Sequence, residues 1–396
     1  MTIPSALIAA YTALGLAYWL WMVHGMVRLR RGVPLLARLR LPGPPRWPRL
    51  SVVVPACDEA DKIEPAARTL LAEDYPDLEL LFVDDRSTDS TGRIIDRLAA
   101  EDRRVKAIHI AELPEGWLGK VHALDRGLKE STGEFVLFTD ADVHFNRGGL
   151  RQAIAYAEHH RLGHLAALPQ LWPATFLVDA MLSVFLRQFL CVMRPWAVRD
   201  PKSRAFLGIG AFNLVRRSAF EATPGFEWLR LEQGDDVGLG LMMKQSGARC
   251  DVVGARGYVA LHWYRTVGEA ARGSEKGWAT GLRFSILRAF IAALMLLAME
   301  LSPVLALLAP AFEPVRPLGW AGLAVLAAAV LALGLMIRWV RVVNPARALA
   351  GPLTAPLLAA MTIRTAILGR RRGGILWRGT LYPTEMLRGG GRIRFP

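Results

Sequence analysis

Residues 134–145 read EFVLFTDADVHF, an apolar run that ends in two carboxylates one residue apart, Asp140 and Asp142. A short apolar run bounded by polar residues is typical of a buried strand. No lysine or arginine in this stretch neutralises the two charges. The carboxylates therefore either point into water or hold a cation, and the rest of the chain must decide between these possibilities.

The chain around this stretch alternates between two patterns. Short β-rich runs occur at residues 50–56 (LSVVVPA), 78–85 (LELLFVDD) and 105–110 (VKAIHI), and helical patterns lie between them at 61–73 and 90–100. Strands that alternate with helices predict an α/β domain with a mainly parallel sheet.

Polar residues come directly after the ends of these predicted strands. In such sheets ligands bind beyond the carboxyl ends of the strands, so the acidic groups there should converge. Converging carboxylates repel one another unless a cation or hydrogen-bond donors lie between them, which predicts a metal-dependent site at this edge. The residues concerned are Cys57, Asp58, Glu59, Asp84, Asp85, Asp140 and Asp142.

The composition narrows the class of protein. The 396 residues carry a net charge of +14, yet 53% of them are hydrophobic. The basic balance suggests a polyanionic partner, which could be nucleic acid, an anionic membrane face or a phosphorylated substrate. Three widely separated cysteines form no disulfide framework, which fits a reducing compartment and argues against structural zinc.

The N-terminus predicts a membrane anchor. Residues 3–27 contain no Asp, Glu, Lys or Arg, and roughly 25 helical residues exceed the ~30 Å hydrocarbon core of a bilayer. A cleaved signal peptide would begin with basic residues, whereas here seven arginines come afterwards, between positions 28 and 49. The positive-inside rule places this basic linker, and the domain after it, in the cytoplasm.

A second apolar zone begins near residue 289. Residues 289–308 and 318–337 are each long enough to span and read as a hairpin. Residues 349–369 precede three arginines that a spanning helix would place outside, so an interfacial or re-entrant segment is expected. Glu300 within the hairpin either contacts substrate or another helix, or is a paired structural residue.

These segments predict five parts. They are a transmembrane anchor (1–27), a basic linker (28–47), a catalytic domain with interfacial helices (48–280), a transmembrane hairpin (281–344) and a re-entrant or interfacial segment (345–396).

Five motifs stand in a familiar order within residues 48–280. They are VVVPACDEAD from residue 52, FVDDRSTDST from 82, GWLGKVHAL from 116, TDADV from 139 and QGDDVGLGL from 233. Together they resemble membrane-bound, inverting family-two glycosyltransferases, including bacterial enzymes whose genes accompany hopanoid or carotenoid genes. The resemblance implies the Rossmann-like GT-A fold and a nucleotide-diphosphate sugar donor.

The resemblance also implies roles for the acidic residues. Asp85 would contact the nucleotide base, and Asp58 and Glu59 the base and ribose. Asp84 would either contact the donor or cap the strand end. Asp140 would face the ribose or share a metal with Asp142. The metal would be Mg²⁺ or Mn²⁺, hard cations that prefer oxygen ligands.

The resemblance also indicates candidate residues for the transfer reaction itself. Lys120 would reach the diphosphate or sugar, since a cation at a helix start is otherwise mildly unfavourable. Asp236 matches the general base of the inverting reaction. Asp235, the other member of this acidic pair, is a second catalytic candidate or could cap the helix that it begins, and Glu232 is the next candidate for the base. His262 is either a late metal ligand or a structural histidine. Two glycines, Gly208 and Gly210, would leave room for sugar or acceptor.

The acceptor side departs from the processive members of this family. Their Gln/Arg-x-x-Arg-Trp motif corresponds here to ARGSEKGWATG from residue 271, where Trp278 is present but Gly277 replaces the arginine. Arg272 and Lys276 could substitute as cations. The helical stretches 172–193 and 270–288 suit the membrane surface.

The expected function is transfer of a single sugar, with UDP-sugars as first candidates, to a lipid-borne hydroxyl at the cytoplasmic face of a bacterial inner membrane. The alternatives are a processive polysaccharide synthase, a polyprenyl-phosphate glycosyltransferase or an inactive membrane scaffold. Nucleic acid is not an expected partner, because many arginines flank apolar segments instead of forming a patch.

Overall fold

The chain divides into two compact units in a computed structural model, which describes residues 3–277, 281–306, 316–340 and 345–394. The helical unit comprises Met1–Gly32, Pro173–Arg194 and Trp263–Gly373. The sheet unit comprises Val33–Trp172, Pro195–His262 and Gly374–Pro396. The predicted boundaries thus differ from the compact units. Pro173–Arg194 and the chain from Trp263 belong to the helical unit, although the predicted domain 48–280 included both, and Gly374–Pro396 belongs to the sheet unit.

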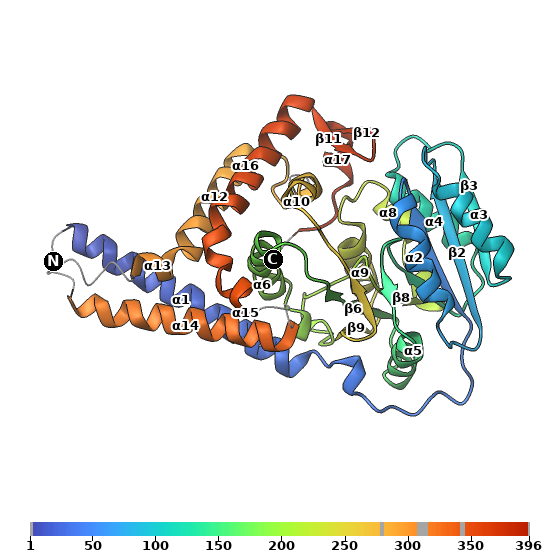
Figure 1. Cartoon of the computed structure of the whole chain (residues 1–396), viewed down its shortest axis with the longest axis horizontal. Helices are drawn as coiled ribbons and strands as arrows, with labels where there is room; N and C mark the ends of the chain where they lie inside the picture. The colour runs from blue at the N-terminus through green and yellow to red at the C-terminus, as the bar shows by residue number, and fades with distance from the viewer. Residues whose placement is uncertain (1–2, 278–280, 307–315, 341–344, 395–396) are drawn as a thin grey trace. The chain divides into compact units, whose positions relative to one another are not determined.

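The sheet unit is built on seven strands in the order β3-β2-β1-β4-β8-β6-β9. Figure 1 labels β2, β3, β6, β8 and β9 of this sheet. Strands β1, β2, β3 and β4 run parallel, whereas β8 is antiparallel to both of its neighbours, β4 and β6. The expected mainly parallel α/β sheet is therefore confirmed. The strands are β1 Leu50–Ala56, β2 Leu78–Asp85, β3 Val105–Ile110, β4 Phe135–Phe138, β6 His164–Leu168, β8 Asn213–Arg216 and β9 Cys250–Gly254.

Helices cover both faces of the sheet, which is why every residue of β1 and β2 is buried. One core cluster joins Val52 and Val54 to apolar residues of α2 and α3. On the opposite face Val53 packs against α4, where a Cβ on Gly127 would lie 2.3 Å from it. The helices of this unit are α2 Ala60–Leu71, α3 Thr91–Glu101, α4 Gly119–Glu130, α5 Gly149–His159, α7 Arg217–Glu221, α8 Gly225–Leu229, α9 Asp235–Gln245 and α17 Thr384–Gly390, with 3₁₀ turns Leu36–Arg38 and Pro195–Ala197.

Two small sheets complete this unit. Strand β10 (Val259–Leu261) pairs with β5 (His144–Phe145) on one side and β7 (Gln170–Leu171) on the other. At the end of the chain, β11 (Gly374–Trp377) and β12 (Thr380–Pro383) form a hairpin. Because β5 comes directly after the Asp140–Asp142 stretch, the first small sheet extends the carboxyl edge of the large one.

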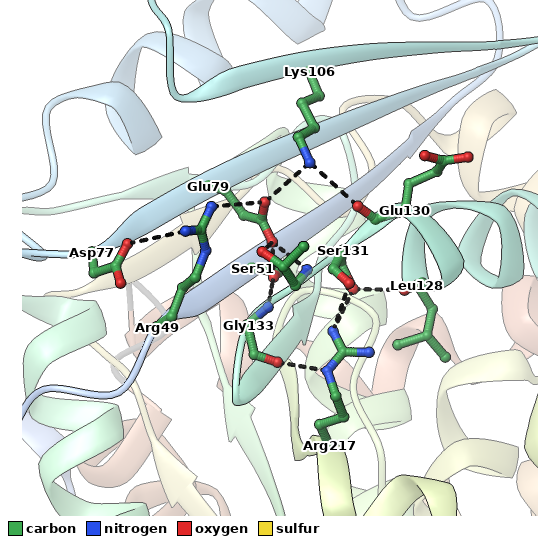
Figure 2. A network of polar contacts seen from close by, with 11 residues as sticks. Arg49, Ser51, Asp77, Glu79, Lys106, Leu128, Glu130, Ser131, Gly133 and Arg217 are labelled. Atoms are coloured by element: carbon green, nitrogen blue, oxygen red, sulfur yellow. Dashed lines mark hydrogen bonds and ion pairs between the residues drawn. The ribbon is translucent and has the colours of Figure 1, made fainter.

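The buried side chain of Glu79 connects several strands of the large sheet at the edge where they begin (Figure 2). Glu79 accepts hydrogen bonds from Ser51 and from the backbone and hydroxyl of Thr132, and its second oxygen lies 3.3 Å from Arg49 and 3.4 Å from Lys106. Burial alone would raise the pKa of Glu79, but these hydrogen bonds and the Lys106 charge lower it to about 2. The ionised carboxylate therefore links β1, β2, β3 and the α4–β4 connection.

The helical unit is a set of apolar helices. Long helix α1 packs against α14, and α12 packs against α16. The helices are α1 Ile3–Gly32, α6 Phe176–Met193, α10 Val267–Gly273, α12 Ile286–Glu300, α13 Ser302–Ala306, α14 Arg316–Val340, α15 Pro345–Leu349 and α16 Ala355–Arg372, with a 3₁₀ turn at Gly351–Thr354.

Glu300 forms the polar centre of this unit. It pairs with Arg187, and both side chains are fully buried. Tyr18 and Gln188 donate to the other oxygen of Glu300, the latter at 3.0 Å, and the Arg187 guanidinium lies 4.7 Å from the Trp19 ring. Of the two interpretations of Glu300, the structure supports the paired, structural one, since a buried charge of this kind requires a partner.

Three helices in the described part of the chain are long and apolar enough to cross a membrane: Ala6–Gly32, Phe176–Ala197 and Gly351–Arg372. The first matches the predicted anchor. Sequence patterns assigned the other two regions to the membrane surface, but their length and composition also allow them to cross. In the predicted hairpin, α12 ends at Glu300, and the apolar part of α14 is the shorter helix Trp320–Met336.

We expect Glu79→Gln to lower stability in a pH-dependent way. The folded pKa of Glu79 lies below its unfolded value of about 4.3, so its contribution is present above that pH and is lost as the pH falls toward 2. Loss of charge-assisted hydrogen bonds should cost roughly 1.5–3 kcal/mol at pH 7. In thermal unfolding of the full chain in detergent, the variant should have a lower midpoint than wild type at pH 7. The difference between the two midpoints should disappear at low pH. Exposed Glu101→Gln serves as the control, and an equal midpoint for Glu79→Gln would contradict this role.

We expect the protein to remain with membranes after a carbonate wash. Apolar helices that cross a bilayer stay inserted at high pH, whereas surface-bound proteins are released. The measurement is the partition of the full chain between pellet and supernatant. Recovery in the supernatant would show that the apolar helices do not span.

Candidate functional site

Lys120 lines a pocket at the carboxyl edge of the large sheet. Its ammonium nitrogen is 2.6 Å from Asp140 Oδ1 and 3.1 Å from Asp235 Oδ2. Asp140 comes after β4, whereas Lys120 and Asp235 lie in the first turns of α4 and α9. The pocket thus brings together residues from three separate sequence motifs. It is lined by Lys120, Leu124, Phe138, Thr139, Asp140, Gly210, Asn213, Asp235, Asp236 and Leu239.

The carboxylate of Asp236 is held on the same pocket by backbone donors. Gly210 N–H donates to Asp236 Oδ2 at 2.9 Å, and Val237 N–H donates to Oδ1 at 2.8 Å. The carbonyl of Gly210 accepts from the backbone N–H of Asp140 at 3.1 Å. Gly210 therefore connects the predicted base to the Asp140–Asp142 stretch through two hydrogen bonds.

Gly208 and Gly210 bring the loop before β8 close to the acidic residues, and at Gly208 the close contact is with backbone, so glycine is required there. A Cβ on Gly210 would lie 2.6 Å from Asp140 Oδ2, and one on Gly208 would lie 1.8 Å from the Asp236 carbonyl oxygen. The expectation that these glycines leave room for sugar or acceptor stays a prediction, and Gly210 lines the pocket. Both glycines let the loop before β8 pack directly against the acidic residues.

The charged groups in the pocket shift one another's pKa values. Burial would lower the pKa of Lys120, but Asp140, Asp235 and Asp236 outweigh it and raise that pKa well above its ordinary value. Burial and the Asp235 carboxylate raise the pKa of Asp236 to about 6. Lys120 thus stays protonated, and the pKa of Asp236 lies closer to neutral pH than that of an ordinary aspartate.

Asp235 does not act as the helix cap that sequence reasoning allowed. The N-cap of α9 is Gly234, and no side chain bonds to the cap position. Asp235 is the first residue of the helix, and its carboxylate faces Lys120. Glu232, the next candidate for the base, has structural partners instead. Its carboxylate accepts hydrogen bonds from the backbone N–H groups of Gly234, Arg392 and Ile393 at 2.6–3.1 Å.

Asp142 fits the predicted cation site. Burial and the neighbouring Asp140 raise the pKa of Asp142 to about 6. Its nearest cation is Lys62, whose nitrogen lies 3.6 Å from Oδ2. Two crowded carboxylates supply the oxygen donors that Mg²⁺ or Mn²⁺ accepts together with phosphate oxygens and water. Among the residues that the structure describes, no group of three or more His, Cys, Asp and Glu side chains has metal-binding geometry.

The predicted nucleotide-binding residues lie around the ends of β1 and β2. Asp85 is buried and makes a bidentate contact with Arg86, at 2.8 and 3.1 Å. Asp58 has a positive φ of 52° and accepts from the backbone of Thr88 at 2.7 Å. Glu59 lies 3.6 Å from Lys62. Their roles toward a donor remain predictions.

Asp84 behaves as a strand-end residue. Its Oδ1 accepts from the backbone of Ser87 at 3.3 Å, and its Oδ2 lies 3.2 Å from His109. This is the second of the two interpretations that its sequence allowed. The pKa of His109 is raised chiefly by Asp96 and then by Asp84, despite partial burial.

The remaining predicted residues are more scattered. His262 comes after β10, beside β5, and its ring lies 5.3 Å from Trp172; a role as metal ligand stays a prediction. Arg272 lies in α10 of the helical unit, and Lys276 comes shortly after that helix. Trp278 lies outside the described residues. Their acceptor-side role also stays a prediction.

Sequence reasoning missed several residues that the structure places in this region. Asn213 Nδ2 donates to the Asp236 carbonyl at 3.1 Å. Arg378 and Tyr382, from the C-terminal hairpin, contact the predicted nucleotide edge. Asn213 could have been found from the sequence, because it is a polar residue at the start of β8. No local signal identified the hairpin residues, because their partners are about 260–320 positions away in sequence.

Comparison with known proteins gives a family assignment for part of the chain. Residues 51–222 match the family described as Glycosyl transferase family 2. The GalNAc(5)-diNAcBac-PP-undecaprenol beta-1,3-glucosyltransferase of Campylobacter jejuni is 33% identical over 103 residues, which cover 26% of this chain and 32% of that protein. The poly(ribitol-phosphate) beta-N-acetylglucosaminyltransferase TarS of Staphylococcus aureus is 31% identical over 114 residues, or 28% of this chain and 19% of TarS. The matches thus span a third or less of these relatives' own length.

A solved structure supports the fold over nearly the whole chain. The mannosyltransferase PcManGT from Pyrobaculum calidifontis, solved with GDP-Man and Mn²⁺, has a TM-score of 0.54 at 19% identity. The similarity covers 93% of this chain and 98% of that one. The chain therefore contains a Glycosyl transferase family 2 domain with a GT-A-like fold.

Proposed function

We propose that this chain transfers a single sugar, with inversion, from a nucleotide-diphosphate sugar to a lipid-borne hydroxyl. The observation that carries the proposal is the pocket that places Lys120 between Asp140 and Asp235 and holds Asp236 on Gly210. Carboxylates for a metal and a base, plus a cation for phosphate, are the groups that this reaction requires. UDP-sugars are the first donors to test.

The chemistry derives from the position of Asp236. Its carboxylate accepts the proton of the acceptor hydroxyl, whose oxygen then attacks the anomeric carbon opposite the leaving diphosphate. The backbone N–H groups of Gly210 and Val237 orient the carboxylate. Lys120, already protonated, attracts the diphosphate and remains tied to Asp235.

Asp140 and Asp142 would hold Mg²⁺ or Mn²⁺. When bound, the ion would act as a Lewis acid that stabilises the leaving diphosphate. Lys62, 3.6 Å from Asp142, would screen part of the negative charge. His262, just after β10, is a further candidate ligand.

The helical unit supports the proposals of a lipid acceptor and of a membrane location. Its three candidate spans would hold the protein in a bacterial inner membrane. The basic linker after α1 would keep the sheet unit on the cytoplasmic face. The relative from Campylobacter jejuni is named for a glucosyltransferase that acts on an undecaprenol-linked acceptor, which supports an isoprenoid lipid among the candidates.

We expect Asp236→Asn to lower kcat by about 10²- to 10⁴-fold, because the amide cannot take the hydroxyl proton. The substitution is nearly isosteric, so the donor KM should change little, whereas the unfolding temperature should fall modestly, because the amide nitrogen cannot accept one of the two backbone N–H bonds that Asp236 accepts. Asp235→Asn keeps an acceptor for Lys120 and should reduce kcat by less than about tenfold. Sugar transfer to extracted lipids, measured with labelled donors, distinguishes the two. A nearly normal Asp236→Asn enzyme with an inactive Asp235→Asn enzyme would identify Asp235 as the base.

We expect activity to require Mg²⁺ or Mn²⁺, and Asp142→Asn to lose donor binding together with activity. Removing one of two carboxylates leaves too few oxygen ligands for the ion. Donor binding and turnover are measured after treatment with a chelator and after restoring each metal. Asp61→Asn, which changes an exposed carboxylate in α2, is the control. Full activity in excess chelator would exclude the metal role.

A further inference from the structure

The C-terminal hairpin lies against the predicted nucleotide edge of the sheet unit. Strands β11 and β12 are joined by a two-residue turn in which Arg378 and Gly379 have φ values of +48° and +76°. Positive φ at both central residues is typical of the tight type I′ turn, which fits the twist of a hairpin. The turn presents the Arg378 side chain at the tip.

Two contacts fix this tip. Ile375 and Tyr382 are cross-strand partners, and both are buried. The Tyr382 hydroxyl accepts from the backbone N–H of Gly119 at 3.3 Å. The hairpin is therefore attached to the first residue of α4, and the next residue, Lys120, carries the ammonium group that contacts Asp140 and Asp235.

Arg378 brings a positive charge to an acidic edge. Its guanidinium pairs with the Glu59 carboxylate and donates to the Asp58 carbonyl at 3.3 Å. Glu59 is largely buried, whereas the Arg378 side chain remains 39% exposed. The exposed part of the planar guanidinium can stack on an aromatic ring or donate to a carbonyl or phosphate oxygen.

The two ends of the site differ in chemistry. Lys120, Asp140 and Asp236 lie where the sugar and diphosphate are expected, whereas Arg378 lies at the other end, beside Asp58 and Glu59. A nucleoside at this second end would offer a flat base and hydroxyl groups, which a guanidinium and a carboxylate recognise.

From these contacts we propose that Arg378 is a donor-specificity residue that binds the nucleoside part of the nucleotide sugar, with Glu59 as its positioning residue. The inference rests on the proposed function and extends it to a residue outside the matched family region, 51–222. The hairpin thereby becomes part of the donor site.

The test is nucleotide binding to the full chain in detergent, by calorimetry, with UDP, GDP, CDP and dTDP as probes. For the nucleotide that wild type binds, Arg378→Ala should weaken the Kd by about tenfold or more and raise the donor KM by a similar factor, since a charged contact is lost. The change in kcat should be less than about threefold. Inhibition by inorganic pyrophosphate, which lacks a nucleoside, should not change.

Three variants complete the experiment. Arg378→Lys, which keeps the charge but not the planar fork, should fall between wild type and Arg378→Ala. Glu59→Gln should weaken nucleotide binding in the same direction. Arg394→Ala changes an exposed arginine of the same C-terminal segment and should leave the Kd unchanged. Unfolding temperatures without nucleotide show that each variant is folded.

Three results would overturn the inference. They are an unchanged Kd for Arg378→Ala, a tighter Kd, which would mean that Arg378 competes with the nucleotide, or an equal loss of pyrophosphate inhibition. Wild type that binds a nucleoside diphosphate but transfers no sugar would refute the proposed function instead. The Kd comparison would still decide the role of Arg378, because it measures nucleotide binding and not transfer.

Discussion

The contact of Lys120 with Asp140 and Asp235 is the interaction on which the site depends. It lies at a helix start, where a cation is disfavoured by the helix dipole, and three nearby carboxylates overcome this cost. Conversely, three carboxylates could not remain close together and ionised without a cation among them. Lys120 therefore allows Asp236 and Asp140 to share one pocket, and burial together with Asp235 still raises the pKa of Asp236.

The first turn of α4 connects the parts of the sheet unit. Gly119 approaches Asp85 so closely that a Cβ would lie 2.2 Å from its carboxylate, and its N–H group donates to Tyr382. Lys120, one residue later, belongs to the pocket proposed as catalytic. A displacement of this turn would thus affect the end of β2, the C-terminal hairpin and the acidic pocket together, so the hairpin is a structural part of the site.

The buried carboxylates of this protein differ in how fully hydrogen-bond donors and cations compensate their charge. Glu79 receives enough donors to stay ionised, and Glu300 has Arg187 with two further donors. Both are satisfied and structural. Asp142 and Asp236 receive fewer compensating groups, and their pKa values rise to about 6. Incomplete compensation makes Asp142 and Asp236 candidates to act on a substrate.

The sequence by itself determined the features that depend on short-range patterns. Apolar runs that end in acidic residues predicted β1, β2 and β4 and placed Asp85 and Asp140 at their ends, and five motifs predicted the GT-A-like fold and singled out Lys120 as a cation at a helix start. Only the tertiary structure decided the features that depend on long-range contacts: the reversed β8, the role of Gly210 as a bridge, the Arg187 partner of Glu300, and the place of Arg378. The reason is physical. A strand or helix start is specified by its neighbours in sequence, whereas a guanidinium at position 378 finds its carboxylate at position 59 only after the sheet, the α4 turn and the hairpin have formed.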